Sequence, residues 1–183
     1  FPGVHIRTEI SSAHSAFATH AAYVPVEWIR ASKTQWINTA YPPTAKDKVE
    51  MKVKFSTVGA SQCLYCSRGT TTTKDTITGF LLKDSKKIRF DRNTSTSASA
   101  QNAVKSEVDY VIVADGNTLD CTVNGQQEAT MADGTFTPGS AFSLFASHTA
   151  GTALSASSNM DNWGSYALYF FRVYDKDGNL VRQ

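Results

Sequence analysis

The stretch that decides the fold runs from Trp163 to Arg182 and reads WGSYALYFFRVYDKDGNLVR. Its first half is dense in aromatic residues and contains no proline, a composition typical of β-strands. Such a continuous apolar run predicts a strand that is buried on both faces. Asp177-Gly178 follows as a turn signal, because glycine accepts a positive φ and aspartate bonds its own backbone. The sequence therefore ends in a strand that would close a β-sandwich.

Most of the remaining chain also consists of strand-like segments separated by turn residues. Residues 49–56 alternate apolar and polar side chains, which predicts one buried face and one solvated face. Asn124-Gly125 indicates a primed two-residue hairpin turn. Residues 93–103, rich in Ser, Thr, Asn and Ala, are interpreted as a loop. Further strands are expected at residues 27–29, 35–37, 63–67, 78–82, 87–90, 107–113, 119–123, 126–129 and 141–146. This pattern predicts an all-β fold, a two-sheet antiparallel β-sandwich of the jelly-roll kind.

Size and composition are consistent with one such domain. The 183 residues are 41% hydrophobic and 19% charged, enough for a full core beneath a neutral polar surface. We assign residues 1–24 to an N-terminal extension and residues 25–183 to the sandwich. The net charge of +2 is too mild to predict a nucleic-acid partner. No apolar run reaches the about 20 residues that cross a bilayer, and abundant Ser and Thr favour a secreted or cell-surface location.

Three cysteines are the candidates for metal or redox chemistry: Cys63, Cys66 and Cys121. Cys63 and Cys66 form a C-x-x-C pair, a spacing found in zinc and thiol-exchange sites. Their surroundings predict a strand, on which positions three apart face opposite sides, so the two thiols are not expected to share a ligand or a bridge. We interpret the cysteines as small buried residues. A disulfide between Cys66 and Cys121 stays open for an oxidising compartment.

Several ordered motifs carry a resemblance to a known family. Residues 26–41, VEWIRASKTQWINTAY, resemble the opening of concanavalin A-like, laminin G-like domains of secreted bacterial proteins. Residues 63–69, CLYCSRG, are similar to that family's Leu-Phe-Gly-x-Arg strand, and residues 115–125 to its hairpin. Residues 142–146 and 169–182 complete the series. The resemblance covers residues 25–183 and does not explain the N-terminal extension.

The resemblance implies two layered antiparallel sheets that bind glycans or other extracellular ligands. Such domains often form one module of a larger secreted protein, so other domains of that protein are expected partners. Trp28 and Trp36 fall in the family's core motifs and are expected to be buried. Neither nucleic-acid binding nor membrane insertion is implied.

Catalysis finds weak support in the sequence. Glycosidases on this sandwich typically carry Glu-x-Asp-x-x-Glu on one strand, because acid and nucleophile must lie about 5 Å apart for retention. Here Glu107-Val108-Asp109 is the nearest match, and Ile112 stands where the third acid belongs. We therefore lean against an enzyme and assign no catalytic residue, with a glycoside hydrolase as the alternative.

The favoured interpretation is a non-catalytic carbohydrate-binding or adhesive module. Sugars stack on exposed aromatic rings while amides, Arg and acids bond their hydroxyls. The predicted ligand site therefore combines aromatic and polar residues: Asp161, Asn162, Trp163, Tyr65, Arg68 and His148. No cofactor is required, although calcium could be held by rim-loop oxygens. Its candidate ligands are Asp161, Asn162, Asp115 and Asn117, and turn formation is the favoured explanation for these residues.

Overall fold

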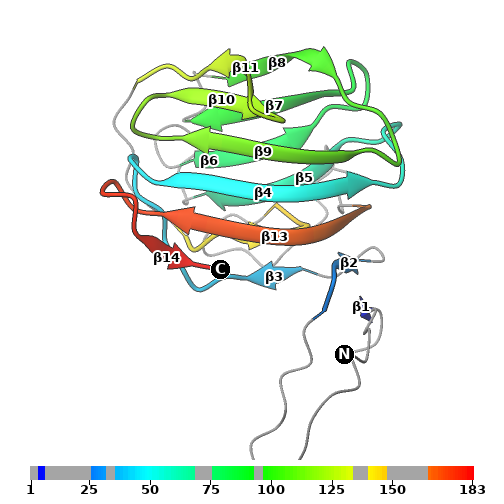
Figure 1. Ribbon diagram of the computed structural model, residues 1–183, viewed down its shortest axis with the longest axis horizontal. Helices are drawn as coiled ribbons and strands as arrows, with labels where there is room; N and C mark the ends of the chain where they lie inside the picture. The colour runs from blue at the N-terminus through cyan, green and yellow to red at the C-terminus, as the bar shows by residue number, and fades with distance from the viewer. Residues whose placement is uncertain are drawn as a thin grey trace, which may run out of the picture.

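Two antiparallel β-sheets packed face to face form the protein in the computed structural model, which describes residues 4–6, 26–31, 36–68, 76–92, 97–133, 140–147 and 165–183 (Figure 1). The described residues form strands joined by turns and loops, with no helix among them. Accordingly, no helix in these ranges could cross a membrane. The predicted all-β sandwich is confirmed.

The larger sheet has eight strands and contains the closing strand near its middle. Its order is β1-β2-β13-β4-β9-β10-β11, with β14 also paired to β13. β1 pairs with β2, so part of the N-terminal extension belongs to the sheet. The strand bounds are β1 Val4–Ile6, β2 Ile29–Ala31, β4 Lys48–Phe55, β9 Asp109–Asp115, β10 Asp120–Val123, β11 Gln126–Thr130, β13 Tyr166–Tyr174 and β14 Leu180–Arg182.

The smaller sheet has six strands in the order β3-β12-β5-β6-β7-β8. Its strand bounds are β3 Ile37–Asn38, β5 Gln62–Arg68, β6 Thr76–Leu81, β7 Lys87–Arg92, β8 Ser97–Ala103 and β12 Ser143–Leu144. The interpretation of residues 93–103 as a loop is wrong for β8, which pairs with β7 at the edge of the sheet. Ala100 is buried, and β7 provides hydrogen-bond partners for the backbone of β8. The short polar side chains of this segment do not by themselves indicate such pairing.

The core lies between the sheets and follows the predicted alternation. On β4, Met51, Val53 and Phe55 are fully buried while their neighbours face solvent in part. Aromatic rings from both sheets meet here, as in the stacked pair of Phe145 and Tyr166, whose centroids lie 4.6 Å apart. This packing holds the two layers together through apolar burial.

The closing strand β13 departs from the prediction that both of its faces are buried. Its register against β4 shifts between Leu168 and Phe170, which leaves Tyr169 as an extra residue. Phe171 and Val173 point into the core, but Tyr169 and Phe170 are half-buried. Bulges of this kind re-aim side chains, and here the shift brings two aromatic rings to the surface.

The cysteine prediction is also corrected by a register shift. Cys63 pairs with Phe80 and Tyr65 pairs with Gly79, so the strand has one extra residue between Cys63 and Tyr65. Cys63, Cys66 and Phe80 consequently form one small buried cluster, separate from the main core. Cys121 lies in the main core instead, and no disulfide joins it to Cys66.

The two lateral sides of the sandwich differ. On one side, β11 and β8 are joined by the buried Glu128, whose carboxylate accepts hydrogen bonds from the backbone N–H and the side-chain amide of Asn102, each at 2.8 Å. These bonds lower the pKa of Glu128. The opposite side, where β2 and β14 face β3, carries a cleft.

Candidate functional site

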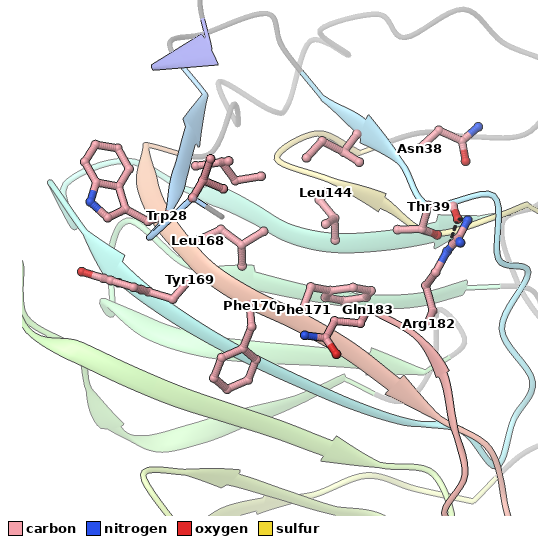
Figure 2. A pocket seen from close by; sticks show the side chains of 13 residues that line it. Trp28, Asn38, Thr39, Leu144, Leu168, Tyr169, Phe170, Phe171, Arg182 and Gln183 are labelled. Atoms are coloured by element: carbon pink, nitrogen blue, oxygen red, sulfur yellow. Dashed lines mark hydrogen bonds between the residues drawn. The ribbon is translucent and has the colours of Figure 1, made fainter. Parts of the chain in front are cut away.

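The cleft between the two sheets, here called the edge cleft, has a volume of about 380 Å³ (Figure 2). This volume falls in the range of about 300–1,000 Å³ that is typical of small-molecule sites. Its interior is apolar and its mouth carries aromatic and polar groups. The lining residues are Val26, Trp28, Ile29, Ile37, Asn38, Thr39, Leu144, Leu168, Tyr169, Phe170, Phe171, Arg182 and Gln183.

An interruption in strand pairing along β13 explains why the cleft lies here. β2 pairs with β13 at Ala167 and Leu168, and β14 pairs with it again only at Val173 and Tyr174. Among the described residues, no strand pairs with β13 between these points on that side. On the facing sheet, β3 contributes only two residues. The gap between the layers therefore stays open at this edge.

Three aromatic residues of the cleft, Trp28, Tyr169 and Phe170, are half-buried, and the rings of Tyr169 and Phe170 lie on the side of β13 opposite Leu168 and Phe171, at the outer face of the larger sheet (Figure 2). Each has a cation over its ring. Arg30 lies 5.5 Å from the Trp28 ring centroid, Lys52 lies 4.7 Å from that of Tyr169, and Arg172 lies 4.4 Å from that of Phe170. Cation–π attraction favours these arrangements and supports the orientation of the rings.

Polar groups at the other end of the cleft come from the ends of β3 and β14 and from the residues that follow them. The Arg182 guanidinium donates hydrogen bonds to the carbonyl oxygen of Thr39 and so ties the two sheets together across the cleft (Figure 2). Asn38 and Gln183 add exposed amide side chains. The arrangement combines aromatic surfaces with amide and guanidinium groups.

The sequence-predicted ligand residues are not assembled at this cleft. Tyr65 is 1% exposed and packs inside the sandwich against Phe142, with ring centroids 5.7 Å apart, so its ring cannot stack on an external ligand. Its assignment to the ligand site is corrected to the core, because the extra residue beside it turns the ring inward. Arg68 is half-buried at the end of β5, and its backbone N–H bonds the hydroxyl of Ser140 at 3.0 Å.

Four further predicted residues, Asp161, Asn162, Trp163 and His148, lie outside the described residues. Their assignment stays a prediction.

The aromatic residues of the cleft were missed, although the sequence held a signal for part of them. Trp28 and Trp36 were expected to be buried, but Trp28 is half-buried at the cleft and Trp36 is 38% exposed. Tyr169, Phe170 and Phe171 are consecutive, and neighbouring residues of a strand point to opposite faces. At least one of the three therefore had to leave the core.

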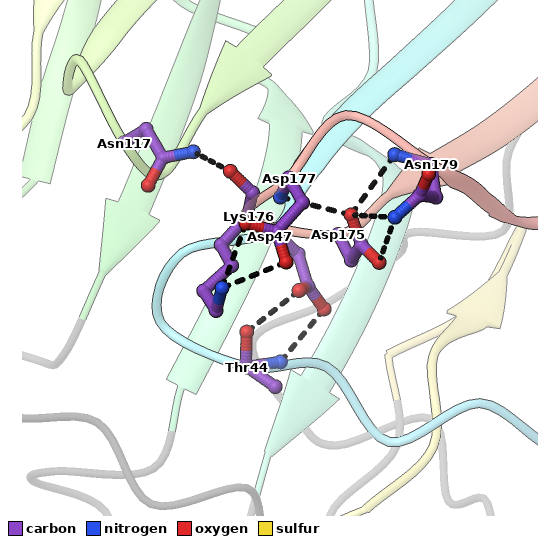
Figure 3. Close-up of polar contacts among 7 residues, drawn as sticks. All are labelled: Thr44, Asp47, Asn117, Asp175, Lys176, Asp177 and Asn179. Atoms are coloured by element: carbon purple, nitrogen blue, oxygen red, sulfur yellow. Dashed lines mark hydrogen bonds and ion pairs between the residues drawn. The ribbon is translucent and has the colours of Figure 1, made fainter.

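The two calcium candidates in the described residues, Asp115 and Asn117, are engaged in turns, and Figure 3 shows Asn117 beside the turn of residues 175–179. Asp115 accepts a hydrogen bond from the backbone N–H of Asn117 at 2.8 Å, and the Asn117 amide donates to the carbonyl of Lys176 at 2.9 Å. In the nearby turn, Asp175 accepts three bonds from Asn179 at 2.9–3.3 Å. Within the described ranges, no group of three or more His, Cys, Asp or Glu residues could hold a metal ion. Turn formation accounts for Asp115 and Asn117.

The carboxylates considered for glycosidase chemistry do not resemble an acid pair. Asp109 lies 2.9 Å from the Lys52 ammonium and 3.5 Å from that of Lys54. The hydrogen bond from Lys52 lowers the pKa of Asp109, whereas a general acid needs a raised pKa. Glu107 is exposed in the preceding turn with a φ of 59°. These two residues provide charge at the surface rather than a proton donor.

Comparisons with known proteins identify the fold. No protein-family model and no curated protein matches the sequence. Mouse laminin α1 chain domains LG4-5 superpose with a TM-score of 0.62 and 12% identity over 95% of this chain. The NanB sialidase from Streptococcus pneumoniae, in complex with a chlorobenzylammonio-ethanesulfonate, gives 0.54 and 17% over 78% of it.

This chain spans 47% of the laminin chain and 24% of the sialidase chain. The likeness shows that the protein has a concanavalin A-like, laminin G-like fold, as the sequence motifs implied.

Proposed function

We propose that this protein is a non-catalytic carbohydrate-binding or adhesive module of a secreted or cell-surface protein, and that a glycan binds at the edge cleft. The observation that carries the proposal is an apolar cleft of about 380 Å³ with the half-buried Trp28 and exposed amides among its lining residues. The shared fold with laminin LG4-5 domains and with part of a sialidase chain is consistent with a binding role.

The chemistry of the cleft suits a sugar ring. A pyranose presents apolar C–H groups on one face and hydroxyls around its rim. The apolar face can lie on the Trp28 ring, while Asn38, Arg182 and Gln183 can bond the hydroxyls. Aromatic stacking contributes about 0.5–1.5 kcal/mol beyond the buried area, so the Trp28 ring should account for a change in affinity of about 2- to 13-fold.

Calorimetric titration with glycans selected on an array tests the proposal. Trp28→Ala should weaken glycan binding by about 2- to 13-fold. Val108→Ala is the matched control, because Val108 is apolar and 41% exposed but does not line the cleft. Circular dichroism would verify that the variants keep their fold. Unchanged affinity in Trp28→Ala would show that the glycan does not bind in the cleft.

A second variant separates the edge cleft from the site predicted from the sequence. Trp163→Ala should leave binding intact if the cleft holds the glycan. Loss of binding in Trp163→Ala with full binding in Trp28→Ala would locate the ligand at residues 161–163 instead.

A further inference from the structure

The buried pair Cys63 and Cys66 differs from an ordinary pair three residues apart on a strand. Their register partners on β6 are Phe80 and Thr78, which are two residues apart. Three residues of β5 therefore span the length that two residues span on β6, about 6.7 Å. The extra residue brings both thiols to the same face of the sheet.

The two thiols are in contact inside a closed environment. Both cysteines are 0% exposed and form a cluster with Phe80. Burial and a side-chain hydrogen bond with Cys66 raise the pKa of Cys63 well above its ordinary value. In the part of the chain that the structure describes, no third His, Cys, Asp or Glu completes a metal-binding group with them.

We propose that Cys63 and Cys66 form a two-thiolate site for a cuprous ion. Two sulfur ligands without a third donor suit a soft monovalent d¹⁰ ion in linear coordination. Zinc, by contrast, requires about four ligands. A disulfide fits less well, because the strand spacing of about 6.7 Å lies at the upper limit of the Cα–Cα distance that a disulfide spans.

Binding is a ligand exchange without a change of oxidation state. Two S–H bonds break, two Cu–S bonds form, and two protons pass to solvent while copper stays Cu⁺. The bound site carries one net negative charge. The positive charge of Arg68 partly opposes the rise in the pKa of Cys63, so Arg68 is close enough to offset part of this negative charge. Affinity for Cu⁺ should rise with pH, because metal binding requires both thiols to lose their protons.

Anaerobic titration of the full chain with Cu⁺ against a chromogenic cuprous chelator tests the site, with native mass spectrometry for stoichiometry. Wild type and Cys121→Ser should each bind one Cu⁺. Cys121 is the matched control because it is a buried cysteine in the separate main core. Cys63→Ser and Cys66→Ser should each lose more than about 100-fold in affinity, since removing a ligand costs more than removing a supporting residue.

Cys63→Ser and Cys66→Ser are nearly isosteric with the wild type, so they are expected to keep the fold. Cys66→Ala is a second variant, and circular dichroism checks that each variant is folded. Failure of the wild type to compete for Cu⁺ would overturn the proposal. So would full binding in either serine variant, or a mass two hydrogens lower that shows the pair closed as a disulfide.

Discussion

Replacing Glu128 with alanine tests whether one carboxylate holds the closed side of the sandwich. Glu128 is 7% exposed and links β11 of the larger sheet to β8 of the smaller sheet through two bonds of 2.8 Å to Asn102. A hydrogen bond to a charged group contributes about 1.5–3 kcal/mol. Asn102 is exposed and can recover bonds with water, so we take the lower end for each bond. The expected loss in the free energy of unfolding is about 3 kcal/mol.

Urea denaturation at neutral pH, followed by circular dichroism, measures this loss. Glu128→Gln is the matched control, because glutamine has the shape of glutamate and keeps one oxygen that can accept a hydrogen bond. Its side-chain nitrogen, however, would face an N–H donor of Asn102. It should lose less than Glu128→Ala. A loss below about 0.5 kcal/mol for Glu128→Ala, the range of ordinary surface substitutions, would refute the reasoning.

The pH dependence gives an independent measurement on the same residue. The folded-state pKa of Glu128 is lowered from its usual value of 4.5, so the unfolded state binds the proton more tightly. The stabilisation from its charge is present above pH 4.5 and is lost as the pH falls through the folded-state pKa. The difference between wild type and Glu128→Ala should therefore narrow on acidification. A difference that does not change with pH would show that the charge makes no contribution.

Three further predictions concern single positions, each measured by urea denaturation. Gly79→Ala should lower the free energy of unfolding by about 1–3 kcal/mol, because the new Cβ would lie 2.5 Å from the buried Tyr65 ring. Gly59→Ala is the control: its new Cβ would have no contact closer than 3.8 Å, so this variant should be nearly as stable as wild type. Equal stability of the two variants would contradict the prediction. Gly125→Ala should cost about 1 kcal/mol through its φ of +77°, and full stability would argue against the primed turn. Asp109→Asn should cost less than about 1 kcal/mol, since Asp109 is exposed and its lysine partners are only half-buried. Any loss of polysaccharide turnover in this variant would reopen the hydrolase alternative.

Local features of the fold were predictable because they depend on few residues. The alternation in 49–56 became β4 with its buried Met51, Val53 and Phe55. Asn124 and Gly125 form the expected turn, with φ values of 51° and 77°. Ser97–Ala103 was not predictable, because its small polar side chains resemble those of a loop and the strand exists through pairing with β7.

The sequence predicted which types of side chain the candidate site contains, but not which residues form it. Aromatic side chains near polar ones were expected, but Tyr65 is in the core and Trp28 is at the surface. Both outcomes depend on neighbours distant in sequence. Trp28 is half-buried because pairing along β13 is interrupted beside it, and no short window of sequence contains that interruption.

The amino-acid order alone determined a layered β-sandwich, since side-chain alternation and turn preference act within a few residues. Tertiary structure alone decided which side of the sandwich is sealed by Glu128 and which stays open, and on which face Cys63 and Cys66 meet. The reason is that a bulge or an unpaired edge is a property of two strands together. One extra residue in a strand changes the face of the sheet to which each later side chain points, and the extra residue can be recognised only by pairing the strand with its neighbour.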